Sequence, residues 1–195
     1  MSDDEPVVSG WDLAKSRDWT VGVALDANGR VCRFLRFQRP WPETLTAIVQ
    51  SIGTTPTLID STGVGDPIVD QLQRVADTCV QGFHFSASSK QQIMEGLALA
   101  IQQQRVQIPD GPLVLELEAF EYAYMPTGVR YAAAEGMHDD AVCALALAVK
   151  HYAWQTQRSP ELIICGERDY MDLDGQPDDS FERYVIKHGC WFPGD

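Results

Sequence analysis

The chain has 195 residues, of which 45% are hydrophobic, and its formal net charge at pH 7 is −13. This length suits one domain with some residues to spare, and this hydrophobic content is enough to build a core. No stretch approaches the roughly 18 consecutive apolar residues of a membrane span, and the acidic N-terminus lacks the basic start of a signal peptide. We therefore expect a globular cytoplasmic protein that does not contact the membrane.

The negative charge is concentrated at the two ends of the chain. Residues 1–9 contribute −3, and residues 161–195 carry nine acidic against three basic side chains. Binding to nucleic acid normally requires cations that neutralise phosphates, so the net charge alone argues against it, but the uneven distribution weakens that objection. We predict an acidic N-terminal extension at 1–9, one domain at 10–158 and an acidic C-terminal tail or appendage at 159–195.

The first part of the chain predicts three short strands at 7–13, 20–25 and 31–37. Asn28 and Gly29 lie between the second and third, and both residue types tolerate the positive φ of a tight turn. An antiparallel meander is expected. A helix at 43–52 follows, where apolar residues recur at helical spacing after Pro40 and Pro42 interrupt the pattern.

The middle of the chain has the order strand, glycine-containing turn and helix. The apolar run 57–59 ends in Asp60, a turn follows at 61–65, and residues 67–75 have helical spacing. This order is typical of a crossover unit in an α/β domain. With a further strand at 78–83 and a long amphipathic helix at 86–104, it predicts a mixed sheet of five or more strands, antiparallel meander plus parallel strands, flanked by helices.

The last third is less regular until its final helix. Residues 113–122 fit a strand or a helix equally well, and residues 129–133 predict a strand. The clearest helix runs from 141 to 154, directly after Asp139 and Asp140. Acidic residues are favoured at that position by the helix dipole.

Three acidic positions are candidates for one metal site. Asp12 lies near the end of the first strand, Asp60 ends a central strand, and the pair Asp139-Asp140 precedes the last helix. Singly, each is more typical of a turn or a helix cap. In combination they suggest a site at the sheet edge where α/β domains bind ligands. Hydrolysis of a phosphodiester by two metal ions requires such converging carboxylates, and Mg²⁺ prefers their oxygen atoms.

Six short motifs stand out in order along the chain. They are GWDLA at 10–14, DWT at 18–20, IDSTGVG at 59–65, SK at 89–90, QIP at 107–109 and GMHDDA at 136–141. Together, over residues 8–155, they resemble the nuclease domain of the large terminase subunit of tailed bacteriophages. The resemblance implies an RNase H-like fold.

The resemblance also implies roles for the acidic residues. It makes Asp12 the ligand on the first strand, Asp60 the bridging or second-strand ligand, and Asp140, with Asp139 close by, the ligand on the helix. Two Mg²⁺ or Mn²⁺ ions would be bound. Successive helical residues point about 100° apart, so either member of the pair can face the ions, and we favour Asp140.

Basic residues near these motifs are candidates for contacts to DNA phosphates. Lys15 and Lys90 are the main candidates, and Lys90 lies where the family has a lysine at a helix start. His138 is equally well interpreted as a phosphate or water contact or as part of the helix cap. For Arg17 and Arg130 we favour an ordinary surface position.

A second acidic group lies at Glu116, Glu118 and Glu121. It is a candidate for an accessory metal ligand. A solvated face, or a buried pair with an arginine, is the interpretation we favour.

The resemblance implies a metal-dependent endonuclease that cuts concatemeric viral double-stranded DNA during genome packaging. The implied partners are a terminase ATPase domain or subunit, the small terminase subunit and the portal. The phosphate-binding pattern G-x-x-x-x-G-K-[ST] of the ATPase motor does not occur in this sequence. Two alternatives stay open: a nuclease that resolves Holliday junctions, and a non-catalytic RNase H-like docking module.

Overall fold

The computed structural model describes residues 5–13, 19–62, 65–75, 80–125, 128–133 and 138–156. The chain divides into two units after Gln157. The predicted tail lies outside the described residues, so it stays a prediction, and β1 already begins at Val8 within the predicted N-terminal extension. No described helix is long and apolar enough to cross a membrane.

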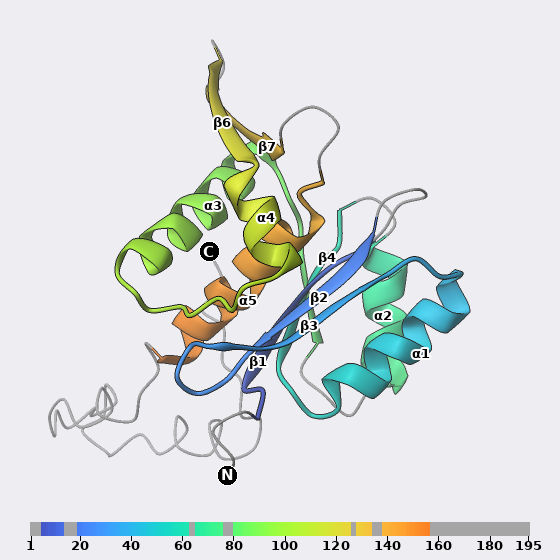
Figure 1. Ribbon diagram of the computed structural model, residues 1–195. Helices are drawn as coiled ribbons and strands as arrows, with labels where there is room; N and C mark the ends of the chain where they lie inside the picture. The colour runs from blue at the N-terminus through green and yellow to red at the C-terminus, as the bar shows by residue number, and fades with distance from the viewer. Residues whose placement is uncertain are drawn as a thin grey trace, which may run out of the picture. The chain divides into compact units, whose positions relative to one another are not determined.

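A five-stranded mixed sheet forms the centre of the domain (Figure 1). Its strands stand in the order β3-β2-β1-β4-β5. In chain order they are β1 (Val8–Asp12), β2 (Thr20–Leu25), β3 (Val31–Phe37), β4 (Thr57–Asp60) and β5 (Val80–Phe83). β1, β2 and β3 pair antiparallel, whereas β4 runs parallel to both β1 and β5. The expected combination of a meander and parallel strands is confirmed.

Helices cover both faces of the sheet. On one face lie α1 (Trp41–Ile52) and α2 (Gly65–Val75), and on the other lies α5 (Asp140–Thr156), with α3 (Ala87–Gln102) and α4 (Pro112–Glu118) packed against it (Figure 1). Successive residues of a strand face opposite sides. Leu58 therefore belongs to the core under α3 and α5, whereas its neighbour Ile59 belongs to the core under α1 and α2.

Gly10 allows α5 to lie directly against β1. A Cβ atom at this position would stand 2.3 Å from the Ala144 carbonyl oxygen and 2.3 Å from the Ala148 nitrogen. Both are backbone atoms of α5, so only glycine permits this approach. The contact aligns the end of β1 with the beginning of α5.

Three details differ from the sequence-based expectations. α1 begins at Trp41, because Pro42 occupies the first turn, where no backbone N–H is needed. In the hairpin turn the positive φ belongs to Gly29 alone, and Asp26 Oδ1 accepts hydrogen bonds from the Asn28 and Arg30 amides. The ambiguous segment 113–122 contains α4 without its first residue, followed by the start of a strand.

That strand, β6 (Phe120–Met125), pairs antiparallel with β7 (Gly128–Ala133). The two form a separate two-stranded sheet that does not extend the central one. The strand expected at 129–133 is thus confirmed, but its pairing partner was not foreseen.

Candidate metal centre

Asp12 and Asp60 meet at one edge of the central sheet. They are the last residues of β1 and β4, which are parallel neighbours with Trp11 opposite Ile59. Parallel strands in this register end at the same level, so the two carboxylates come from adjacent positions of a rigid scaffold. The Asp60 Oδ1 atom accepts a hydrogen bond of 2.8 Å from the Thr62 amide, which orders the turn after β4.

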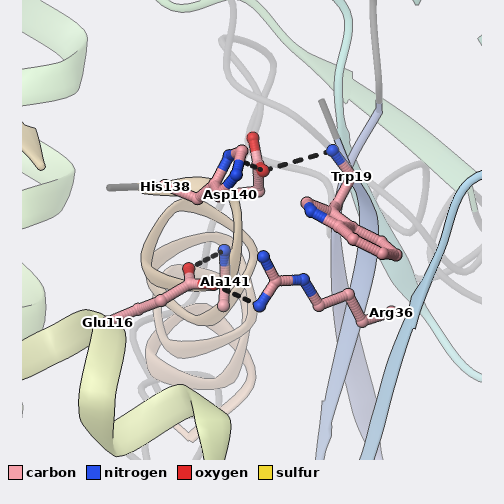
Figure 2. A network of polar contacts seen from close by, with 6 residues as sticks. All are labelled: Trp19, Arg36, Glu116, His138, Asp140 and Ala141. Carbon is pink, nitrogen blue, oxygen red and sulfur yellow. Dashed lines mark hydrogen bonds and ion pairs between the residues drawn. The ribbon is translucent and has the colours of Figure 1, made fainter. Parts of the chain in front are cut away.

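Asp140 reaches the same edge from α5. It is the first residue of this helix, and its side chain is buried. Its Oδ2 atom accepts a 3.3 Å hydrogen bond from the Trp19 backbone nitrogen, and the Nδ1 atom of His138 lies 3.6 Å from the same oxygen (Figure 2). His138 is thus beside the candidate ligand, which leaves both of its sequence interpretations open.

Asp139, the other member of the pair, has a different partner. Its Oδ2 atom lies 2.9 Å from Nζ of Lys90, which stands in the first turn of α3. α3 begins with a capping box, in which Ser86 Oγ accepts from the Ser89 amide and Ser89 Oγ accepts from the Ser86 amide. Lys90 thus lies beside Asp139, and its contact with a DNA phosphate stays a prediction.

The charges of the other three acidic residues act on Asp12. Burial raises the pKa of Asp12 well above its ordinary value, and the charges of Asp60, Asp140 and Asp139 raise it further, whereas Lys90 lowers it. Burial and the Asp12 charge also raise the pKa of the Cys143 thiol, which stays protonated in the core. The expectation that Cys143 is a core residue is confirmed.

The donor set fits a hard divalent cation. All four acids offer oxygen atoms, and the negative charge they gather is only partly offset by Lys90. Among the described residues, no three His, Cys, Asp or Glu side chains converge as the ligands of one ion would. In this arrangement Asp139 is paired with Lys90, and Asp140 accepts from Trp19.

The remaining predicted residues fall into three groups. Lys15 and Arg17 lie outside the described residues, and Arg130 lies on β7. Glu118 and Glu121 are exposed, whereas Glu116 is buried. Glu116 Oε1 stands 2.8 Å from Arg36 Nη1, which confirms the favoured interpretation of a buried pair with an arginine.

Two residues near the site were not anticipated from the sequence. Trp19 supplies a backbone amide to Asp140, and Arg36 contacts both Glu116 and the Trp19 ring. Trp19 belongs to the DWT motif at 18–20, which was a usable signal. The sequence gives no such signal for Arg36, because an arginine on a strand near the edge of a sheet is common.

Known proteins resemble the chain in both sequence and structure. No protein-family model matches. The large terminase subunit of Thermus virus P23-45 is 31% identical over 156 residues, a match that covers 73% of this chain and 31% of that relative. The large terminase nuclease of the thermophilic phage G20c, in a crystal structure with bound magnesium, superposes with a TM-score of 0.66 and 28% identity over 73% of this chain and 79% of that one.

The chain is homologous to large terminase nuclease domains. A second crystal structure of the G20c nuclease, with bound cobalt, gives a TM-score of 0.66 and 27% identity, and covers 73% of this chain and 79% of that one. The RNase H-like fold expected from the motifs is therefore confirmed. The chain spans about a third of the length of the full large terminase subunits that it matches.

Proposed function

We propose that this chain is a DNA endonuclease that depends on Mg²⁺ or Mn²⁺. The observation that carries the proposal is that β1, β4 and α5 bring Asp12, Asp60 and Asp140 to one sheet edge, with Asp139 beside them. The homologous large terminase nuclease of phage G20c has magnesium or cobalt bound in its crystal structures, which supports a divalent metal in this chain. We also propose that the site holds two ions and that Asp12, Asp60 and Asp140 are their ligands.

The chemistry would be hydrolysis of a phosphodiester bond. Bound divalent ions activate a water molecule and stabilise the leaving oxygen in such reactions. The chain's own part is to hold the ligands on rigid elements: Asp12 and Asp60 at strand ends, Asp140 at a helix start. Lys90 and His138 stand at the rim, where a DNA phosphate would approach.

We further propose that the substrate is concatemeric viral double-stranded DNA, cut during genome packaging in the host cytoplasm. The proposed partners are a terminase ATPase domain or subunit, the small terminase subunit and the portal. The homology to large terminase subunits supports this context.

Plasmid cleavage by the full chain tests the activity. Supercoiled plasmid incubated with Mn²⁺ or Mg²⁺ should be nicked and linearised, and chelation of the metal with EDTA should stop the reaction. Asp60→Asn keeps an oxygen that can accept from the Thr62 amide but removes the charge. We expect it to lower the cleavage rate by more than roughly 100-fold, beyond the typical loss when only a supporting group is altered.

Asp70→Asn is the matched control, because Asp70 is exposed on α2 and the substitution is the same. It should cut at the wild-type rate. Undiminished cutting by Asp60→Asn would refute the assignment of the site. Faster cleavage of four-way junctions than of linear duplex would favour a junction resolvase, and no calorimetric signal with millimolar Mn²⁺ would favour a docking module.

A further inference from the structure

Glu116 is a buried acidic residue that joins two elements beside the metal centre. It lies on α4, and each of its carboxylate oxygens has a different contact. Oε2 accepts a 3.0 Å hydrogen bond from the Ala141 amide of α5, and Oε1 lies 2.8 Å from Arg36 Nη1 on β3 (Figure 2). The side chain therefore connects a helix start to the sheet.

The contact with Ala141 restrains the backbone directly after Asp140. The first amides of a helix have no acceptor within the helix and need one from elsewhere. In α5 the intrahelical pattern begins with the Cys143 amide, which donates to the Asp139 carbonyl. Glu116 supplies the acceptor for the Ala141 amide from a neighbouring helix, so it holds the turn that carries the candidate ligand.

Arg36 is also linked to Asp140 through Trp19. Its guanidinium stands 4.7 Å from the centre of the Trp19 ring, at a distance typical of a cation–π contact. The backbone nitrogen of Trp19 in turn donates to Asp140 Oδ2. In Figure 2 one contact from the Arg36–Glu116 pair ends at the Ala141 amide, directly after Asp140, and the Trp19 amide beside Arg36 contacts the Asp140 carboxylate.

We propose that Arg36 and Glu116 are positioning residues that hold Asp140 in the orientation needed to bind a metal ion. The inference rests on the proposed function. A buried ion pair gives little net stability, because the loss of hydration offsets the attraction. Here Arg36 also neutralises a carboxylate that would otherwise add to the charge of the acidic site. The pair thus supports α5 without competing for the metal.

Titration calorimetry of the full chain with Mn²⁺ tests the proposal. Glu116→Gln can still accept from the Ala141 amide, but its amide group would then face Arg36. Arg36→Met removes the charge above the Trp19 ring. Loss of a group that orients a metal ligand typically lowers the metal affinity by 10- to 100-fold, so both variants should bind Mn²⁺ more weakly by about that factor.

Glu118→Gln is the matched control, because Glu118 lies on the same helix and is exposed. Its Mn²⁺ affinity should equal that of the wild type. Thermal unfolding in EDTA separates a structural role from a positioning role. If Glu116→Gln and Arg36→Met melt earlier but bind Mn²⁺ as tightly as the wild type, the proposal is wrong.

The double variant Arg36→Met with Glu116→Gln covers the case in which a single variant does not fold. It removes both charges together and so leaves no unpaired buried charge. The proposal requires that the Mn²⁺ affinity of this variant is also reduced, and it is overturned if the affinity is that of the wild type. Absence of Mn²⁺ binding by the wild type would instead overturn the proposed function, and this inference with it.

Discussion

Replacing Gly10 with alanine tests whether the distance between β1 and α5 controls the metal centre. The added Cβ atom would stand 2.3 Å from the Ala144 oxygen and the Ala148 nitrogen, and 2.9 Å from the Leu147 carbonyl carbon. All three are backbone atoms, so no side chain can rotate away to relieve the contact. Ordinary contacts begin near 3.4 Å, and α5 must therefore retreat by about 1 Å.

Two losses follow from this shift. Overpacking of a closely packed core typically costs about 1–3 kcal/mol of unfolding free energy. Gly10 lies two residues before Asp12, and Ala144 lies about one helical turn after Asp140, so the retreat also separates these two carboxylates. A misplacement of about 1 Å can lower a catalytic rate by roughly 100-fold.

Urea unfolding and plasmid cleavage with Mn²⁺ measure the two effects separately. Gly96→Ala provides the control, because Gly96 is exposed in α3 and a Cβ atom there meets nothing within 4 Å. Alanine is the better helix former, so this variant should gain up to about 1 kcal/mol and cut DNA as the wild type does.

Wild-type stability of Gly10→Ala would refute the packing argument. If Gly10→Ala is less stable but cuts DNA at the wild-type rate, at a temperature where it is folded, the packing argument is still correct. That result would show that the β1–α5 distance does not determine the activity.

The remaining predictions concern the stability of the two helices that border the site. Burial lowers the pKa of His151 on α5 from 6.5 to about 4, so the unfolded chain binds a proton more readily than the native one. Above pH 6.5 the ring is neutral in both states and does not affect the free energy of unfolding. As the pH falls from 6.5 towards 4, protonation of the unfolded chain lowers this free energy, by roughly 3 kcal/mol at most. In urea unfolding at a series of pH values, His151→Leu should lose less stability on acidification than the wild type, and parallel curves would contradict the assigned pKa. Ser86→Ala removes the capping acceptor of α3 and should lower the unfolding free energy by about 1 kcal/mol in the same assay; no loss would show that the cap is dispensable.

Local patterns predicted most of the central architecture. Alternating or continuous apolar runs located all five strands of the sheet, and Gly29 marked the turn between β2 and β3. The order strand, turn and helix after Asp60 identified the parallel part. These features are visible in the sequence because they depend on residues close together in the chain, through periodicity and backbone preference.

The acidic edge was predictable for a related reason. Asp12 and Asp60 end strands, and Asp140 begins an apolar helix, so the topology alone brings them to one edge. The different partners of Asp139 and Asp140 were not predictable. They depend on tertiary contacts, because Lys90 of α3 pairs with Asp139 and the Trp19 amide contacts Asp140. The preference for Asp140 as the metal ligand stays a prediction.

The contacts around the site depend on packing between distant segments. Glu116 was one of three similar acids in the sequence, yet only the structure shows that it reaches both Arg36 and the Ala141 amide. Gly10 gave no local sign that α5 lies against it. The sequence by itself determined which elements form and which acids lie at their ends. The tertiary structure decided the partner of each charge, because a partner is set by the distance between elements and not by spacing along the chain.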